Sequence, residues 1–358
     1  MKKICFFVGN LNHSGGTERV STSIANALAE RGYEITMLNL WKGNNPFFEL
    51  HSSIVNDTLH PQRISFAKNY FGAVRKLREY LKRNNIETLI VVESMLALFS
   101  LPASSGLKLN HITWEHFNYN VDLGKRSRSL ARRLARFFSD SIVTLTERDK
   151  NIWLKKTIGR ARVLAIPNPS PYEISNHIPS LDNKVVLAIG RLTYQKGFDY
   201  LLKAWKEIKK EGRFADWRLQ IVGEGEDKDL LHNLIADLTI SNSVEIYPFS
   251  NNVSEFYKNA SVYCLSSRFE GLPMVLIETQ SLGLPVVAFD CDTGPSEIIA
   301  DGKSGLLSKA EDYSDLALKL SQMMSISDEE YSQFSLNAKK QAERFKLVNI
   351  IEHWLKLV

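Results

Sequence analysis

The chain has 358 residues, of which 44% are hydrophobic, 10% aromatic and 24% charged. This composition excludes a disordered chain and predicts two globular domains, because one hydrophobic core rarely organises so many residues. The net charge of +5 is mild, and we expect no nucleic-acid partner. Three distant cysteines without metal-ligand spacing predict reduced thiols and a cytoplasmic protein.

Short apolar runs alternate with helical patterns along the first half, which is typical of βαβ units with parallel sheets. The predicted strands are KICFFVG, EITMLNL, TLIVVES, HITWEH and SIVTLTE. Residues 16–32 predict an amphipathic helix that stops at Gly32. The opening apolar run is short and lacks a small-residue cleavage site, so we read it as a first strand rather than a signal peptide.

A proline-rich polar stretch leads into the second half, where strands and helices alternate again. We predict a first domain over 1–168, joined by 343–358, a linker over 169–183, and a second domain over 184–342. The predicted strands are KVVLAIGRL, WRLQIVGEG, VEIYPF, SVYCLSS and PVVAFD. After PVVAFD we expect helices only, ending in the amphipathic helix FKLVNIIEHWLKLV.

Two loops of the first domain carry unusual residues at predicted strand ends, where open α/β sheets bind ligands. Gly15 and Gly16 open a helix, so backbone amides at its positive end can approach an anion or a sugar closely. The alternative is a tight turn. His116 ends the strand HITWEH and reaches the same edge, with a structural histidine as the alternative.

In the second domain, Arg191 and Lys196 of the loop GRLTYQKGF follow a strand. A forked guanidinium beside a compact ammonium suits a pyrophosphate, and solvated surface charges are the alternative. The stretch RFEGLPMVLIE places Glu270 at a strand end and Glu278 inside the following helix.

Between these two acids, the amides after Gly271, beginning with Leu272, stand at the positive end of the predicted helix and suit a phosphate. A carboxylate at Glu278 suits two ribose hydroxyls. The alternative makes both acids surface or helix-dipole partners.

Two motifs are decoys in our interpretation. Asp290 and Asp292 have the Asp-x-Asp spacing of a metal site, but we predict no metal there. GEGEDKD at 223–229 lacks the third glycine of a dinucleotide fingerprint, so we discount a nicotinamide enzyme.

Taken together, GGTER, EH, GRLTYQKG, the two acids with seven residues between them, and GPSEIIADGKSGLL resemble glycosyltransferase family 4. The resemblance covers almost the whole chain, and is greatest to the bacterial branch that builds lipopolysaccharide, capsule, exopolysaccharide and lipid-linked glycans. It implies retaining enzymes with the α/β GT-B fold. In that fold two Rossmann-like domains face a central cleft, and the C-terminal helix crosses back to the first domain.

The resemblance also implies roles for individual residues. The implied catalytic residues are His116, Glu270, Arg191 and Lys196. The implied donor-binding residues are Gly15, Gly16, Arg191, Lys196, Glu270, Gly271, Leu272 and Glu278. The implied donor is a UDP-hexose or UDP-N-acetylhexosamine, galactose or its N-acetylamino form first, and no metal or other cofactor is required.

Residues 124–136 hold six cations and no acid. As a basic amphipathic helix, this segment predicts that Arg128, Arg132 and Arg133 bind an anionic membrane surface or the phosphates of a polyprenyl-diphosphate-linked glycan acceptor. The enzyme would then be peripheral on the inner face of the cytoplasmic membrane. The alternative is a solvated helix whose apolar side packs on the first domain.

Two other function classes stay open from the sequence. A sugar-nucleotide epimerase of the same architecture would need no acceptor. A two-lobed sugar-binding protein would bind its ligand without catalysing a reaction.

Overall fold

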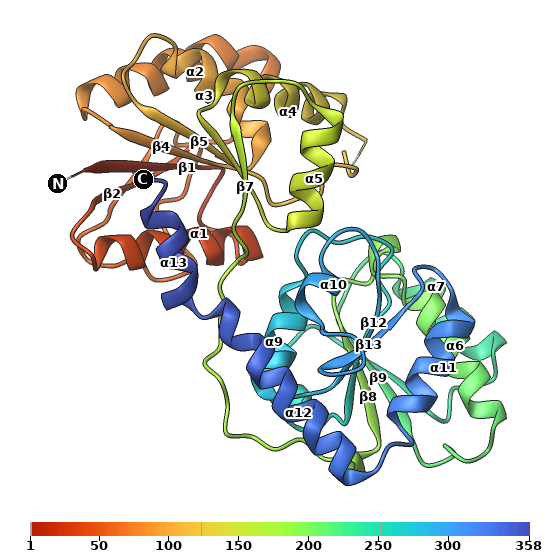
Figure 1. Cartoon of the computed structure of the whole chain (residues 1–358). Coiled ribbons are helices and arrows are strands. Elements are labelled where there is room, and N and C mark those ends of the chain that lie inside the picture. Colours follow the sequence, from red (N-terminus) through yellow and green to blue (C-terminus); the bar gives the residue numbers. More distant parts are fainter. Residues whose placement is uncertain (1, 123, 251) are drawn as a thin grey trace. The chain divides into compact units, whose positions relative to one another are not determined.

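The computed structural model describes residues 2–122, 124–250 and 252–358 (Figure 1). The chain forms two compact units: unit 1 is Met1–Pro169 with Leu347–Val358, and unit 2 is Ser170–Lys346. All three cysteines are buried and unpaired. Over the described ranges, every helix is too short or too polar to cross a membrane.

Unit 1 is built on a seven-stranded parallel sheet with the order β3-β2-β1-β4-β5-β6-β7. Its two central strands, KICFFV and TLIVV, are largely apolar and buried, as expected for a parallel sheet covered on both faces. The strands are β1 (Lys3–Val8), β2 (Glu34–Asn39), β3 (Val55–Thr58), β4 (Thr88–Val92), β5 (Asn110–Trp114), β6 (Ser141–Thr144) and β7 (Arg162–Ala165).

Helices connect these strands and cover the sheet (Figure 1). They are α1 (Gly16–Ala29), α2 (Phe66–Arg83), the 3-10 turn η1 (Ser94–Leu96), α3 (Ala97–Ser104), α4 (Arg126–Phe138), α5 (Glu147–Lys156) and α13 (Leu347–Leu355). The predicted helix over 16–32 is confirmed as α1, and Gly32 lies in the following turn with φ +85°.

Unit 2 has a six-stranded parallel sheet with the order β10-β9-β8-β11-β12-β13. Its strands are β8 (Val185–Ile189), β9 (Arg218–Val222), β10 (Val244–Tyr247), β11 (Val262–Leu265), β12 (Val286–Phe289) and β13 (Gly305–Ser308). Its α-helices are α6 (Phe198–Lys210), α7 (Lys228–Asp237), α8 (Val253–Lys258), α9 (Met274–Leu282), α10 (Pro295–Ile298), α11 (Tyr313–Met323) and α12 (Asp328–Ala342). Three 3-10 turns complete it: η2 (Leu181–Asn183), η3 (Tyr194–Lys196) and η4 (Glu343–Phe345).

The chain leaves unit 1 after Pro169 and re-enters it at Leu347. The returning helix α13 is the amphipathic helix that the sequence predicts, and it lies beside α1 (Figure 1). It buries Ile350, Ile351 and Trp354, whose indole ring centroid lies 4.6 Å from that of Trp114. The C-terminal segment is therefore part of the core of unit 1.

Three strands have no counterpart in the sequence prediction: β3, β7 and β13. The expectation of helices only after PVVAFD is wrong, because β13 pairs with β12. Each of the three has four residues and lies at a sheet edge. Edge strands bury less apolar surface than central ones, so their sequences carry a weaker hydrophobic signal.

Candidate active site

The strand order of unit 2 reverses at β8, with β9 and β10 on one side and β11, β12 and β13 on the other. In open parallel sheets such a reversal leaves a crevice at the carboxyl ends of the two strands, and ligands bind there. The loops 190–197 and 266–273, which follow β8 and β11, emerge at this point. They carry the cations and the first acid that the sequence singles out.

Lys196 and Glu270 are in direct contact. The Lys196 Nζ lies 2.7 Å from Glu270 Oε1, and the Ser267 hydroxyl donates to the same oxygen at 2.7 Å. The Lys196 side chain is 18% exposed and that of Glu270 is 8% exposed, so this ion pair is largely shielded from solvent. The sequence assigns the two residues to different parts of a ligand, and the structure brings them together.

Arg268 joins the two loops and is a residue that sequence reasoning missed. Its guanidinium donates to both oxygens of Asp199, at 2.9 and 2.8 Å, and to the Tyr194 carbonyl at 2.7 Å. It also lies between the rings of Tyr194 and Tyr200, 4.0 and 4.5 Å from their centroids. A bidentate, stacked arginine has little conformational freedom. Arg268 therefore fixes the loop that carries Lys196 beside the loop that carries Glu270. Its place two residues before Glu270 is the only sequence signal for it.

The loop that carries the exposed Arg191 packs closely against the segment 223–227. A Cβ added to Gly223 would lie 1.9 Å from the Gly190 carbonyl oxygen, and one added to Gly225 would lie 2.2 Å from that of Leu192. Only glycine permits such an approach. The GEG motif, which the sequence offers as a weak dinucleotide fingerprint, therefore supports the Arg191 loop.

Gly271 and Leu272 lead into α9, which begins at Met274 after Pro273. Glu278 lies inside this helix and is 9% exposed, with the Tyr257 hydroxyl donating to its Oε2 at 2.8 Å. Burial raises the pKa of Tyr257 well above its ordinary value, and Glu278 adds to this effect. The phenol therefore stays protonated and keeps donating.

The Asp-x-Asp segment follows β12 and packs against the turn before α9. The Asp292 carbonyl accepts the Glu270 N–H at 2.7 Å, and the Thr293 hydroxyl donates to the Gly271 carbonyl at 2.9 Å. Within the described ranges, three or more His, Cys, Asp or Glu side chains nowhere gather into a metal-binding group. These backbone contacts give the segment a role in holding the Glu270 turn.

The sheet of unit 1 reverses its order at β1, which lies between β2 and β4. Gly15 and Gly16 are exposed at the start of α1 there. A cavity of about 460 Å³ opens at the same edge, and its lining includes Glu18, Trp41, Glu93, Phe117 and Arg128. Unit 1 thus has a ligand-sized recess at the place where this sheet topology predicts one.

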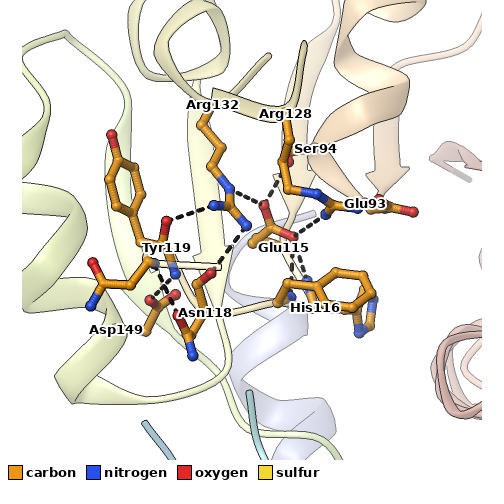
Figure 2. A network of polar contacts seen from close by, with 11 residues as sticks. Glu93, Ser94, Glu115, His116, Asn118, Tyr119, Arg128, Arg132 and Asp149 are labelled. Atoms are coloured by element: carbon orange, nitrogen blue, oxygen red, sulfur yellow. Dashed lines mark hydrogen bonds and ion pairs between the residues drawn. The ribbon is translucent and has the colours of Figure 1, made fainter. Parts of the chain in front are cut away.

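The turn after β5 is organised by a buried carboxylate, that of Glu115 (Figure 2). Its Oε1 accepts the N–H groups of His116 and Phe117, each at 3.1 Å, and its Oε2 accepts the Ser94 hydroxyl at 2.5 Å. Arg132 donates to Oε2 at 2.9 Å and to the carbonyls of Tyr119 and Asn118 at 2.6 and 3.1 Å. One ion pair therefore holds the whole turn that carries His116.

The surroundings of Glu115 and His116 determine their protonation states. Burial acts to raise the pKa of Glu115, but Arg132, the Ser94 hydroxyl and Arg128 outweigh it and hold that pKa below its ordinary value. Burial lowers the pKa of His116 to about 4 against the opposing charge of Glu115. The His116 ring lies 4.6 Å from that of Trp114, and its Nε2 has no hydrogen-bond partner among the described residues. His116 is therefore a neutral imidazole whose Nε2 is buried.

The predicted membrane role of Arg128 and Arg132 is corrected by their burial. Arg128 is 3% exposed and pairs with Glu93 at 2.6 Å, and Arg132 is 1% exposed and pairs with Glu115. The Glu115 carboxylate at the end of β5 is buried and the Glu93 side chain at the end of β4 is 30% exposed, and α4 supplies counter-charges to both (Figure 2). Of the three arginines named from the sequence, only Arg133 is exposed.

Two family models match the chain. That of glycosyl transferases group 1 matches residues 173–341, and that of Glycosyltransferase Family 4 matches residues 14–171. An uncharacterized glycosyltransferase of Haemophilus influenzae is 39% identical over 99% of both chains. The amylovoran biosynthesis glycosyltransferase AmsD of Erwinia amylovora is 32% identical over 84% of both.

A third relative is an α-1,4-N-acetyl-D-galactosaminyltransferase of Campylobacter jejuni, named for an undecaprenol-diphosphate-linked acceptor. It is 30% identical over all of this chain and 98% of its own. Among solved structures, the lipopolysaccharide outer core galactosyltransferase WaaB has a TM-score of 0.78 at 21% identity, over 99% of this chain and 98% of its own. Anabaena HepE in complex with UDP has a TM-score of 0.80 at 17% identity, over 99% of both. At these identities the structures show that the fold is the same.

Proposed function

The chain belongs to glycosyltransferase family 4 and has the GT-B fold, and from this premise we propose that it is a retaining transferase. It moves a hexose or N-acetylhexosamine from a UDP-sugar to a glycan acceptor in bacterial surface polysaccharide synthesis. The observation that carries the proposal is the contact of Lys196 with Glu270 at the strand reversal of unit 2. It supplies a cation for a diphosphate and a carboxylate for sugar hydroxyls in one place.

In this proposal the diphosphate of the donor binds at the loops of unit 2. Arg191 forks across phosphate oxygens, Lys196 adds a compact charge, and the amides after Gly271 point at the phosphates from the start of α9. Glu278 accepts hydroxyls of the ribose. As the C1–oxygen bond of the sugar breaks, negative charge builds on the departing phosphate, and these groups stabilise it without a metal.

Glu270 exchanges partners when the donor binds. In the free protein its Oε1 accepts from Lys196 and Ser267. When the diphosphate attracts Lys196, the carboxylate becomes available to the hydroxyls of the sugar. Binding of the phosphates thus prepares the acid that reads the sugar.

The acceptor attacks C1 on the face that the phosphate leaves. Its hydroxyl oxygen forms the new bond to C1, and its proton passes to the departing phosphate oxygen, so the anomeric configuration is kept. The neutral His116 imidazole contacts the sugar beside this centre, and Gly15 and Gly16 allow close approach to the donor phosphate and the acceptor. The proton lost by the acceptor is the proton gained by the departing phosphate, so the transfer needs no proton from elsewhere.

For the substrates, we propose UDP-galactose or UDP-N-acetylgalactosamine first, then the gluco forms. The N-acetylgalactosaminyltransferase activity for which the Campylobacter relative is named and the UDP of the Anabaena structure support this choice. The acceptor is a polyprenyl-diphosphate-linked glycan, or lipopolysaccharide, at the inner face of the cytoplasmic membrane.

The test incubates the protein with a panel of UDP-sugars and GDP-mannose, with and without an undecaprenyl-diphosphate glycan. We expect UDP release that depends on the acceptor, and an α-linked product from an α-linked donor. Release of an epimer without acceptor would favour an epimerase, and bound sugar without any turnover would favour a binding protein. A preference for GDP-mannose would overturn the donor assignment.

A variant pair tests the role of Glu270. Glu270→Gln keeps the size of the side chain but removes its charge. Turnover should fall at least tenfold, because a charged hydrogen bond typically contributes about 1.5–3 kcal/mol. The affinity for UDP should be kept, because Glu270 contacts the sugar and not the nucleotide in our proposal. Glu224→Gln, at an exposed acid of the same unit, is the matched control. Unchanged turnover of Glu270→Gln would remove this residue from the mechanism.

A further inference from the structure

The outward face of α4 carries large apolar side chains as well as cations. Arg128, Ala131, Arg132 and Ala135 are buried on its inner side. The opposite stripe, at helical spacing, consists of Arg126, Leu130, Arg133 and Phe137. Leu130 is 53% exposed and Phe137 is 52% exposed, so two large apolar side chains alternate with two arginines on this face.

The loop 157–161 extends this surface at the C-terminal end of α4. The Arg136 guanidinium donates to the Gly159 carbonyl at 2.6 Å, and Arg160 donates to the Phe138 carbonyl at 3.4 Å. These bonds fasten Ile158, which is 86% exposed, beside the end of the helix. We call the surface formed by these residues the α4 face. Its apolar members are Leu130, Phe137, Phe138 and Ile158, and its cations are Arg126, Arg133 and Arg160.

The charge of the surrounding segment is one-sided. In residues 125–162, the exposed acids are Asp140 and Glu147. The exposed cations there are Lys125, Arg126, Arg133, Lys155, Lys156, Arg160 and Arg162. An exposed apolar patch rimmed by cations is unusual for a soluble surface and matches an anionic lipid surface.

A cavity adjoins the flank of α4 and offers room for an apolar chain. It has a volume of about 500 Å³, and Leu134 and Phe138 of α4 and Arg160 of the loop form part of its wall. Four leucines of α3 and of the loop before β5 form another part of the wall, and Ser104, His111 and Asp140 add polar groups to it. An acyl chain that enters here would keep a phosphate near Arg160.

We propose that the α4 face docks unit 1 onto an anionic lipid bilayer, with Phe137 and Ile158 inserted among the lipids and Arg133 and Arg160 bound to their phosphates. The inference rests on the proposed function, because a lipid-linked acceptor requires the enzyme at a membrane. It places the membrane contact on the side of α4 opposite to Arg128 and Arg132. The arginines that face inward hold the His116 turn, and those that face outward meet the lipid.

The experiment measures co-sedimentation of the 358-residue chain with phosphatidylglycerol-containing vesicles and with pure phosphatidylcholine vesicles. Arg133→Ser/Arg160→Ser should weaken binding to the anionic vesicles roughly thirtyfold, since each cation near the surface contributes about 1 kcal/mol. Phe137→Ser/Ile158→Ser should weaken it about tenfold or more. Lys228→Ser/Leu230→Ser, an exposed cation and apolar pair on α7 of unit 2, is the matched control and should bind like the parent.

Failure of this proposal and failure of the proposed function have different readouts. Transfer to a water-soluble acceptor analogue should be the same in all these variants, because none alters a proposed active-site residue. If the parent does not sediment with anionic vesicles, or if both α4-face variants bind as it does, the docking surface is wrong. If light scattering shows a dimer that the Phe137→Ser/Ile158→Ser variant loses, the face joins two copies of the chain instead. Loss of transfer with vesicle binding intact would count against the function alone.

Discussion

At the scale of single residues, the free protein holds its site charges in pairs. Lys196 is neutralised by Glu270, and Arg268 by Asp199, while Arg191 is exposed. A paired cation is released only when a stronger anion arrives, whereas the exposed Arg191 is ready to bind at once. We therefore expect Arg191 to make the first contact with a diphosphate and Lys196 the second.

This order predicts the effect of removing the ligands of the nucleotide. Arg191→Ala and Glu278→Ala should each weaken UDP binding by roughly ten- to a hundredfold, because a charged hydrogen bond contributes about 1.5–3 kcal/mol. Isothermal titration calorimetry measures the affinity. Lys228→Ala, an exposed cation of the same unit, serves as control. Parent-like affinity of both site variants would show that the nucleotide binds elsewhere.

Metal independence is a second prediction at this scale. The fixed cations and the start of α9 already face the diphosphate in our proposal, so transfer should persist after treatment with a chelator. The measurement is the initial rate of UDP release before and after chelation. If activity is lost and manganese or magnesium restores it, Asp290 and Asp292 become candidate ligands.

The neutral state of His116 predicts a pH effect on stability. Its pKa is lowered by burial from 6.5 to about 4, so only the unfolded chain takes up its proton between these values. The stability it contributes is complete above pH 6.5 and is lost as the pH falls towards 4, by about 1.4 kcal/mol per pH unit. Urea unfolding at several pH values should show the parent losing stability faster than His116→Gln. Parallel curves for the two proteins would mean that folding does not lower the pKa of His116.

At the scale of elements, α4 works as a two-sided helix. Its inner arginines satisfy the carboxylates at the ends of β4 and β5, and its outer stripe is left for a partner. Ordinary amphipathic helices bury leucine and expose arginine. Here the sheet edge supplies the buried Glu115 and the partly exposed Glu93, so the helix turns arginines inward.

This arrangement predicts unequal effects of two neighbouring arginines. Arg132→Met should cost about 3–5 kcal/mol of unfolding free energy, because it leaves Glu115 without its main counter-charge in the interior. Arg133→Ser, one position along the same helix, should change the unfolding free energy by less than about 0.5 kcal/mol. Urea unfolding measures both. Equal effects would contradict the orientation of α4.

At the scale of the whole molecule, the chain enters unit 1 twice. The returning helix α13 contributes Trp354, which is fully buried and contacts Trp114 on β5. Because Trp114 directly precedes Glu115 and His116, the C-terminal helix supports the strand that ends in the His116 turn. Two segments far apart in sequence thus share one core.

Trp354→Ala should therefore destabilise unit 1 selectively. Removing a buried tryptophan costs about 3–5 kcal/mol, so the unfolding transition of unit 1 should move to lower urea while that of unit 2 stays in place. Val348→Ala, at a position of α13 that is 58% exposed, is the control. UDP affinity, which we assign to unit 2, should be kept in both variants. A shift of both transitions together would mean that the units unfold as one.

Local pattern was enough to predict much of the molecule. Alternation of apolar runs with helical periodicity predicted the α/β class, and all ten strands named from the sequence are present. The position of each loop after its strand predicted that Lys196 and Glu270 lie at the carboxyl edge of one sheet and His116 at the carboxyl edge of the other. These features depend on residues close together in sequence, and for that reason they could be predicted without a structure.

Tertiary structure decided what local pattern leaves open. Periodicity defines two faces on α4, but not which one turns inward, and that choice depends on Glu93 and Glu115 from two other strands. The contact of Lys196 with Glu270, and the arginine that holds it, likewise join segments some seventy residues apart. Burying a charge costs free energy unless an opposite charge lies beside it in the interior. Only the folded sheets bring such partners together.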